Sequence, residues 1–476
     1  MSSQPRAWPA LVAPCACSVA LLTWLAACQP QPTHGDSPPP GDDTSPPPVE
    51  MFEDIQVEVS EEIPTVATLT WKTLEPAVCE VTFGAEGGSS ATTAAEGEAS
   101  SEHEAVLVGV PQQQEIVFEI AASAASGEFV SEPQHYTTGT LSPDLPDLRV
   151  LVEPEEQAAG AMYLGTTFSF ETDLLATDGL VGLMDAGGNV LWAVSTAFAP
   201  RARLAPDGTG VLYLSQGMDE DAVHVMVRQV SWTGEVLWEV EEATAQRDFA
   251  ILDDGTVAVL VRDDGAIAGH DGEVSGDALM LLHPDGSTET TWSVFDQLGP
   301  SWCTTGAGDP TDWSHADFLE WLPEQGLLLI VLRELQAIVA IDPWTGEQAW
   351  LLAEQCGDFV NEGGEPLLVN PHSVLPTADG LLIFNQGEHA VGCSGAIELA
   401  FDPAAPTVSA IWSWEDPACL HTGFMGNAQP LPSGNRLVTM EGLVRELAPD
   451  GTVVHEIYGG IGVEFGYVEQ VEGLYP

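Results

Sequence analysis

The stretch Ala337 to Trp350, AIVAIDPWTGEQAW, consists of an apolar strand, a Gly turn and a second strand that ends in Trp. The unit recurs as GLVGLMDAGGNVLW to Trp192, VRQVSWTGEVLW to Trp238, LMLLHPDGSTETTW to Trp292 and IELAFDPAAPTVSAIW to Trp412, and LVRELAPDGTVVHEI has His455 near the Trp position. Glycine at such turns supplies the positive φ that a tight hairpin requires. Each unit therefore predicts a β-hairpin.

A second kind of hairpin alternates with the first. RLAPDGTGVLYL, FAILDDGTVAVLV, FLEWLPEQGLLLIVL, SVLPTADGLLIF and AQPLPSGNRLVTM each contain a strand, a polar Gly turn and another strand. Two hairpins make a four-stranded antiparallel sheet, and a closed ring of such sheets has few free edges. The repeats predict an all-β chain with a six-bladed β-propeller over residues 145–476. A tandem of β-sandwiches is the alternative, which the regularity disfavours.

Residues 51–141 predict a separate, small β-sandwich that precedes the propeller. IQVEVS, TVATLTWKT, CEVTFGA, EAVLVGV and EIVFEIAAS are short alternating strands between Gly, Pro and acidic turns. Their order, with TLTWKT as the second strand that bears a Trp, resembles a fibronectin type III domain. The resemblance implies a spacer or a binding module, and no catalytic cluster occurs in this segment.

The first residues carry an export signal. Arg6 precedes the apolar run LVAPCACSVALLTWLAAC, which ends at Leu25-Ala26-Ala27-Cys28 and resembles a bacterial lipoprotein signal. The resemblance implies that residues 1–27 are removed, that Cys28 is lipidated and, because Gln29 follows, that the protein is exported to the outer membrane, cell surface or periplasm. Residues 28–50 are rich in Pro, Asp and Ser and predict an extended tether. An ordinary signal peptide with a chance Cys is the alternative.

The charge and the cysteines limit the possible partners. With 73 Asp plus Glu against 11 Lys plus Arg, the net charge of −62 repels nucleic acid and anionic lipid, so we expect membrane contact only through a lipid anchor. Cys303, Cys356, Cys393 and Cys419 allow three pairings, of which we favour Cys303–Cys356 and Cys393–Cys419. Cys79 is then an unpaired, buried strand residue. The chain has no CxxC spacing and no full EF-hand loop, so we expect no metal and no cofactor.

Polar residues stand at a shared phase ahead of several apolar strands. His315 precedes the FLEW hairpin and Arg333 ends it, His372 precedes the next hairpin, and Asn427 precedes a further one, with His421 upstream. Ligands of propellers bind near the central channel, where the innermost strands meet, so we expect these side chains to converge there. Arg333 in so acidic a chain is either a structural partner of an Asp or part of an anion site.

The segment Asp312 to Trp350 resembles the bacterial arylsulfate sulfotransferase family. It has that family's aromatic-x-His segment at Trp313-Ser314-His315, a strand that ends in Arg333, and IDPWTGEQAW. HSVLPTADGLLIFNQG and GNAQPLPSGNRLV are similar to the family's next two segments, and the likeness spans residues 145–465. The resemblance implies a six-bladed propeller that moves a sulfuryl group from a phenolic sulfate ester to a phenol, without a nucleotide, through a sulfohistidine. It implies His372 as the nucleophile.

The same resemblance places Arg333 and His315 on the sulfate oxygens, with Asn427 and His421 as lesser contacts. Three segments depart from the family's pattern: Asp317 replaces an Asn, Gln246-Arg247-Asp248 stand where a His is usual, and FNQG, with the uncharged Asn385 and Gln386, replaces FDNG. We expect Asp317 to orient His315, and Arg247 to supply substitute charge. The alternatives are a non-catalytic surface lipoprotein whose propeller binds a sulfated or phenolic ligand or a protein partner, and a structural surface protein.

Overall fold

The computed structural model describes residues 51–88, 90–141, 145–155, 160–169, 179–218, 223–266, 272–298, 312–354, 357–388, 392–471 and 473–475. Within these ranges the regular structure is β-strand apart from the short helix α1 (Val294–Gln297), which confirms the all-β prediction. None of the described helices is long and apolar enough to cross a bilayer. The predicted signal, lipidated Cys28 and tether, and the predicted Cys303–Cys356 pair, lie outside the described residues.

The N-terminal sheet contains seven strands: β1 (Phe52–Val59), β2 (Ala67–Ala85), β3 (Ser90–Thr92), β4 (Ser100–Leu107), β5 (Glu115–Ala124), β6 (Gly127–Val130) and β7 (Gln134–Thr137). TVATLTWKT and CEVTFGA, which the sequence predicts as two strands, form the single strand β2. The first half of β2 pairs with β1 and β4, and its second half pairs with β3 and β5. One strand thus runs through both halves of the sheet, whose core includes Trp71, Cys79 and Phe118.

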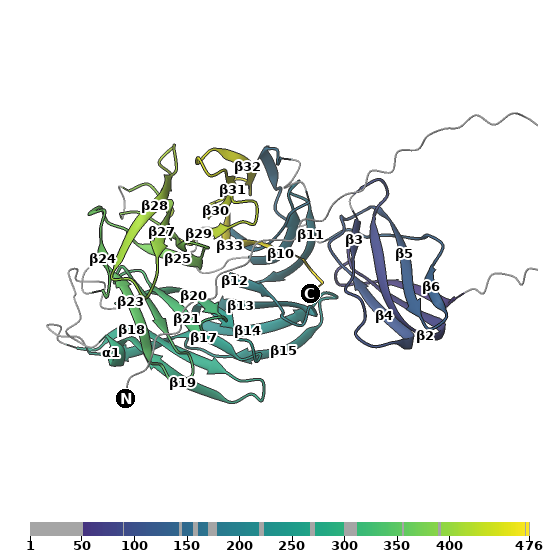
Figure 1. Ribbon diagram of the computed structural model, residues 1–476, viewed down its shortest axis with the longest axis horizontal. Helices are drawn as coiled ribbons and strands as arrows, with labels where there is room; N and C mark the ends of the chain where they lie inside the picture. The colour runs from purple at the N-terminus through teal and green to yellow at the C-terminus, as the bar shows by residue number, and fades with distance from the viewer. Residues whose placement is uncertain are drawn as a thin grey trace, which may run out of the picture. The chain divides into compact units, whose positions relative to one another are not determined.

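Six further sheets form the blades of a β-propeller (Figure 1). Blade 1 contains β33 (Val463–Val471), β9 (Met162–Ser169), β10 (Gly179–Asp185) and β11 (Val190–Thr196), blade 2 contains β12 (Phe198–Leu204), β13 (Gly210–Met218), β14 (Val223–Ser231) and β15 (Val236–Glu241), and blade 3 contains β16 (Ala245–Ile251), β17 (Val257–Gly265), β18 (Val274–Leu282) and β19 (Thr288–Ser293).

Blade 4 contains β20 (Ala316–Leu322), β21 (Leu327–Leu332), β22 (Ala337–Ile341) and β23 (Gln348–Ala353). Blade 5 contains β25 (Pro371–Pro376), β26 (Gly380–Asn385), β27 (Gly395–Phe401) and β28 (Thr407–Glu415), with β24 (Val360–Asn361) at its edge, and blade 6 contains β29 (Asn427–Pro430), β30 (Arg436–Met440), β31 (Leu443–Leu447) and β32 (Val453–Tyr458), with β8 (Arg149–Val152) at its edge. The predicted six-bladed propeller is confirmed.

Both ends of the propeller segment close the ring. The C-terminal β33 pairs with β9 and supplies the innermost strand of blade 1, while β8 pairs with β32 at the outer edge of blade 6. β33 buries Phe465, Tyr467 and Val468. Burying each such side chain contributes about 1.5–3 kcal/mol, so β33 is a large part of the stability of the ring.

Three of the six residues that mark the repeat make hydrogen bonds to a neighbouring blade. Nε1 of Trp192 in blade 1 donates to the Trp232 carbonyl at 2.8 Å, and Nε1 of Trp412 in blade 5 donates to the Pro449 carbonyl at 2.9 Å. Nε2 of His455, at the Trp position of blade 6, is 2.9 Å from the Ala186 carbonyl. Each acceptor lies in the turn between the third and fourth strands of the next blade. His455 therefore makes the same hydrogen bond between blades as a Trp, because its ring also offers an N–H.

The cysteines of the described part agree with the predicted pattern. Cys393 and Cys419 form a disulfide, which confirms one of the two favoured pairs. Cys79 is free and buried in β2, as predicted.

We predict that a chain ending at Gly460, which lacks β33, loses the cooperative melting of the propeller, because β9 becomes an open edge and several apolar side chains lose their cover. The free energy of unfolding of a whole domain is typically about 5–15 kcal/mol, so the loss of one innermost strand is large enough to be seen. Thermal melting followed by circular dichroism is the measurement. The control is Ile461→Ser, at a residue that is 98% exposed, which should leave the melting temperature unchanged. An unchanged melting curve in the truncated chain would contradict ring closure by β33.

Candidate active site

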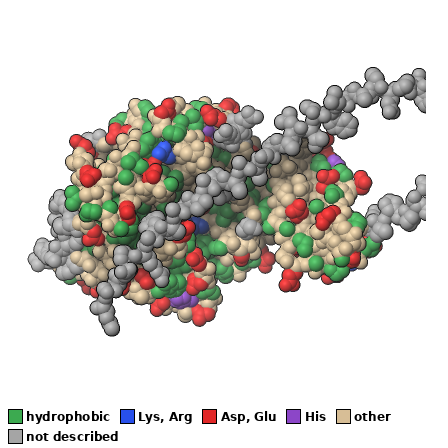
Figure 2. Space-filling view, in the orientation of Figure 1, with side chains coloured by type: hydrophobic (Ala, Val, Ile, Leu, Met, Phe, Trp, Pro, Cys, Tyr) green, Lys and Arg blue, Asp and Glu red, His purple; other side chains and the backbone are tan. Residues whose placement is uncertain are grey.

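A cavity of about 270 Å³ lies where the innermost strands meet. Its lining combines cations, carboxylates and aromatic rings from several blades: Phe198, Pro200, Arg201, Gln216, Arg247, Asp248, His315, Asp317, Phe318, Arg333, His372, Gly423, Phe424, Met425 and Tyr467. The chain is strongly acidic, and Figure 2 shows red carboxylates spread over one face with few blue cations. Of the 11 Lys and Arg residues in the chain, Arg201, Arg247 and Arg333 line this cavity.

Irregular pairing in the innermost strands turns the polar side chains into the cavity. The register shifts in β12, β16, β20, β25 and β33, whereas β29 of blade 6 keeps a regular register. A β-bulge adds one residue to a strand, bends it and redirects a side chain. In or next to these five bulges lie the lining residues Arg201, Arg247, Asp317, His372 and Tyr467.

Three lining residues have left-handed backbone conformations. The φ angles are 59° at Arg247, 45° at His315 and 61° at Met425. A residue other than glycine held there costs about 1–3 kcal/mol, and such strain is concentrated at functional sites. The surrounding sheets must therefore hold these residues in place.

Arg333 and His315 meet at the open end of the β20–β21 hairpin, as the sequence predicts. The backbone N–H of Arg333 donates to the His315 carbonyl at 3.0 Å. Nη1 of Arg333 donates to Oε1 of Gln386 at 3.2 Å, and Nε2 of Gln386 donates to the Met425 carbonyl at 2.9 Å. Gln386, which is buried, thus fixes the guanidinium of blade 4 from blade 5.

Asp317 lies at the centre of a charged cluster. Its carboxylate is 3.2 Å from Nε2 of His315, 3.5 Å from Nε of Arg247 and 3.5 Å from Nε of Arg333. Burial alone would raise the pKa of Asp317, but the neighbouring positive charges, of which His315 is the largest, hold that pKa well below its usual range. Asp317 is ionised at neutral pH and holds three cationic side chains together.

His315 is positioned to carry a proton. Nδ1 lies 2.5 Å from Asp312 and Nε2 lies 3.2 Å from Asp317, so both ring nitrogens face a carboxylate. Burial lowers the pKa of His315, but Asp317 and Asp312 outweigh it, and the net pKa is raised. Arg247 shares these partners, because its guanidinium contacts Asp312, Asp277 and Asp317. The charge of Arg247 is therefore largely balanced inside the protein.

His372 has the opposite character. Nδ1 lies 2.7 Å from the Gly426 carbonyl, which can only accept, so Nδ1 carries the proton and the lone pair is on Nε2. Burial lowers the pKa of His372 to about 4, so the ring is neutral at neutral pH. Gly426 has a φ of 107°, and a Cβ there would lie 2.3 Å from the Phe384 ring, so only glycine delivers this carbonyl.

Arg201 is a lining residue that the sequence analysis missed. Its side chain is 1% exposed, and its guanidinium carbon lies 3.1 Å from the Tyr467 ring centroid. Its Nε is 3.7 Å from Asp248, and Nε and Nη1 have no hydrogen-bond partner among the described residues. The scarcity of cations in the chain was the one available signal, because an Arg in such a sequence is a notable residue wherever it occurs.

The two predicted lesser contacts lie outside this lining. The amide of Asn427 donates to the Val468 carbonyl at 2.8 Å and accepts from the Val468 N–H at 3.2 Å, so it joins β29 to β33. His421 precedes the lining segment Gly423–Met425 without lining the cavity itself. The structure thus brings together His315, Asp317, Arg333, His372 and Arg247, and leaves Asn427 and His421 apart from them.

The solved structures that match the chain are distant in sequence. They include a putative 6-phosphogluconolactonase from Bacteroides fragilis, with 10% identity, a TM-score of 0.40 and coverage of 67% of this chain and 100% of that chain. Another is a periplasmic gluconolactonase from Pseudomonas aeruginosa, with 14% identity, a TM-score of 0.38 and coverage of 83% and 99%. No curated protein matches the chain.

A family model gives the assignment that these distant structures do not. The model described as Arylsulfotransferase (ASST) matches residues 153–457, which is more than half of the chain. The match includes strands of all six blades, although not β33, and every lining residue except Tyr467. The chain therefore belongs to the arylsulfotransferase (ASST) family.

Proposed function

We propose that the protein moves a sulfuryl group from an aryl sulfate to a phenol through a sulfohistidine at His372, without a nucleotide. The observation that carries this proposal is the hydrogen bond between Nδ1 of His372 and the Gly426 carbonyl, which leaves the lone pair on Nε2 of a neutral ring. A neutral imidazole in a cavity that also holds cations is suited to attack an anionic ester. The family supports a sulfotransferase.

In the first half-reaction, Nε2 of His372 attacks the sulfur of the ester and the bond between sulfur and the aryl oxygen breaks. The imidazolium of His315 gives a proton to the departing phenolate oxygen, and a phenol leaves. Nδ1–H of His372 keeps its hydrogen bond to the Gly426 carbonyl, and this bond stabilises the positive charge that develops on the ring.

In the second half-reaction, the oxygen of an acceptor phenol attacks the same sulfur. His315, now neutral, takes the phenol proton, and the bond between Nε2 and sulfur breaks. A new aryl sulfate leaves, and both histidines return to their starting protonation states. No electrons are exchanged and no further reactant is required.

The remaining lining groups suit the charge and the ring of the substrate. Arg333, fixed by Gln386 and Asp317, offers N–H donors for two sulfuryl oxygens. Arg201 has free donor capacity in the same cavity, and hydrogen bonds of this type gain strength away from water. Phe198 and Phe424, with ring centroids 5.6 Å apart, offer an apolar wall for an aryl group.

A second candidate function is binding of an aryl sulfate or phenol without turnover. The arrangement of Asp317 favours it, because this carboxylate lies within 3.5 Å of both Arg247 and Arg333 and competes with a sulfate for their charge. Saturable binding of p-nitrophenyl sulfate with no release of nitrophenolate distinguishes this function from transfer.

We also propose that the propeller works outside the cytoplasm, held to a membrane by lipid on Cys28 and spaced from it by residues 29–50 and a fibronectin-like sandwich. The lipobox-like Leu25-Ala26-Ala27-Cys28 and the Pro-rich segment support this proposal.

Replacing the nucleophile gives the first test of transfer. We predict that His372→Ala lowers nitrophenolate release from p-nitrophenyl sulfate, with phenol as acceptor, by about 10³-fold or more, because the covalent step is lost. The matched control is His283→Gln, in a partly exposed His of blade 3 outside the cavity, which should keep the wild-type rate. Equal rates in wild type and His372→Ala would exclude His372 as the nucleophile.

The pH profile tests the two histidines separately. Because the pKa of His372 is lowered to about 4, kcat/KM should rise with pH through that region as Nε2 becomes free. Because the pKa of His315 is raised above 6.5, kcat/KM should fall only at a pH above 6.5, where the general acid loses its proton.

The same profile measured for Asp317→Asn should have its alkaline limb at lower pH, because the negative charge that raises the pKa of His315 is gone. An alkaline limb that stays in place, or moves to higher pH, would exclude His315 as the titrating acid.

For the anchor, we predict that Cys28→Ser abolishes incorporation of labelled palmitate and moves the protein from the membrane fraction to the soluble fraction of the cell. A membrane-bound, unlabelled wild-type protein would argue against lipidation.

A further inference from the structure

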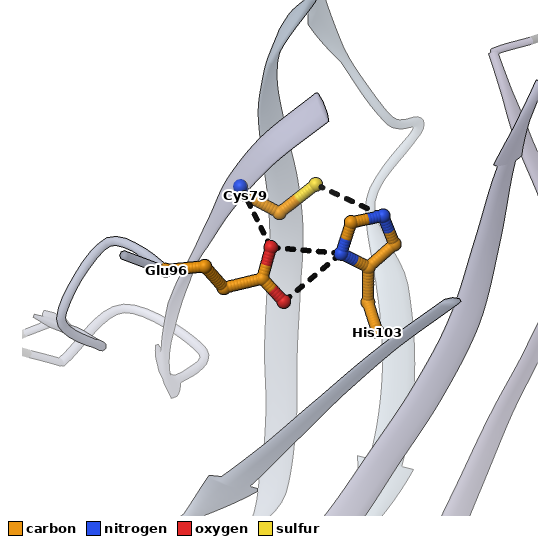
Figure 3. A group of neighbouring side chains, drawn as sticks. All are labelled: Cys79, Glu96 and His103. Carbon is orange, nitrogen blue, oxygen red and sulfur yellow. Dashed lines mark hydrogen bonds and ion pairs between the residues drawn. The ribbon is translucent and has the colours of Figure 1, made fainter. Parts of the chain in front are cut away.

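Three metal-ligating side chains meet inside the N-terminal sheet, away from the propeller cavity (Figure 3). Cys79 is on β2, His103 is on β4, and Glu96 is in the loop between β3 and β4. One ligand atom from each lies within 4.8 Å of the other two. Figure 3 shows the sulfur, the carboxylate and the imidazole pointing toward one another.

The cluster is built into the core of the sheet. The side chain of His103 has no exposed surface, and Cys79 is 1% exposed. His103 stacks on Trp71 with ring centroids 5.1 Å apart, which fixes the plane of the imidazole. Oε2 of Glu96 accepts from the Cys79 N–H at 3.1 Å and lies 2.8 Å from Nδ1 of His103. Burying polar groups costs free energy unless they have partners, and here the two buried ligands, Cys79 and His103, have the partly exposed Glu96 as a common partner.

We propose that Cys79, Glu96 and His103 bind a Zn²⁺ ion through Sγ, one carboxylate oxygen and Nδ1. Zinc bonds of about 2.0–2.3 Å to these atoms separate tetrahedral ligands by about 3–4 Å. Sγ lies 3.8 Å from Nε2 of His103, whereas Glu96 faces Nδ1 at 2.8 Å, so the Cys79 side chain must shift toward Nδ1 for the three atoms to share an ion. The ion displaces the thiol proton and the proton between Nδ1 and Glu96. One divalent cation with one thiolate and one carboxylate leaves the buried site neutral, which avoids the cost of an uncompensated charge.

The surroundings provide the outer contact and the open position that such a site requires. Nε2 of His103 lies 2.9 Å from Oγ1 of Thr73, whose hydroxyl lies 3.3 Å from the Ser100 carbonyl. Thr73 can therefore accept Nε2–H while donating to Ser100, and it holds the ring with Nδ1 toward the ion. Cys79 and Glu96 also line a cavity of about 240 Å³, which has room for a water as the fourth ligand.

The burial of the thiol disfavours the other use of a Cys, His and Glu cluster, a nucleophilic triad. Burial raises the pKa of Cys79 to about 11, so no free thiolate is present near neutral pH. A bound cation removes that barrier because it stabilises the thiolate directly.

The test must separate this site from weak binding of cations by the acidic surface, so it follows a thiolate signal. The reduced full chain is titrated with Co²⁺ as a probe for zinc. We expect one equivalent to produce a thiolate-to-cobalt charge-transfer band in the near ultraviolet, which Zn²⁺ then removes. Cys79→Ser should abolish the band, and Thr73→Val should weaken Co²⁺ binding by about 10–100-fold.

The matched control is His135→Gln, because His135 also faces a glutamate of this sheet, Glu115 at 3.3 Å, and no described cysteine lies with it. That variant should keep the band and the affinity. Zn²⁺ should also raise the melting temperature of the wild-type chain and not that of His103→Gln. Absence of the band in the wild-type chain, or its persistence in Cys79→Ser, would overturn the proposal whatever the stability of the variants.

Discussion

The extra residues in the innermost strands of five blades, two in β16 and one in each of the others, are the feature on which the candidate site depends. A regular strand sends alternate side chains to its two faces, where they pack between blades. A bulge breaks that alternation and directs a side chain along the channel instead. Because β33 closes the ring, the five bulges face one another, and Arg201, Arg247, Asp317, His372 and Tyr467 reach one cavity. The apolar packing between the blades supports the strained backbone at Arg247 and His315.

The pKa values of the two histidines in the cavity are shifted in opposite directions by their surroundings. His315 lies between two carboxylates and gains a proton, whereas His372 donates to a backbone carbonyl and stays neutral. A pair whose pKa values are pushed in opposite directions provides an acid and a base at the same pH. The arginines differ in the same way: Arg247 is occupied by three aspartates, while two nitrogens of Arg201 have no partner in the described residues. Arg201 contacts Asp248 and Glu469 only at 3.7 and 3.5 Å, so in the proposed reaction we assign the sulfuryl oxygens mainly to Arg201 and Arg333.

The regular part of the fold could be predicted from the sequence, and the irregular part could not. Gly turns and the recurring Trp specify hairpins locally, so the six blades and the meeting of His315 with Arg333 followed from the pattern. Bulges leave no clear local signal, and Arg201 and Gln386 reach the site only because distant strands converge.

Asn427 stands at the same phase of the repeat as the residues of the site, yet its amide joins β29 to β33. A short polar side chain next to an unpaired backbone segment makes hydrogen bonds with that backbone first. The Cys79, Glu96 and His103 cluster has no sequence spacing of its own, because it forms across two paired strands and a loop.

The proposed transfer depends most on a covalent bond between sulfur and Nε2 of His372. The most direct measurement is mass spectrometry of the peptide that contains residue 372, after the protein is incubated with an aryl sulfate donor alone and quenched at alkaline pH to preserve a sulfohistidine. We predict one added sulfuryl group on His372, which disappears when a phenol is supplied before the quench. Turnover of the donor with no adduct on His372, or with the adduct on another residue, would contradict it.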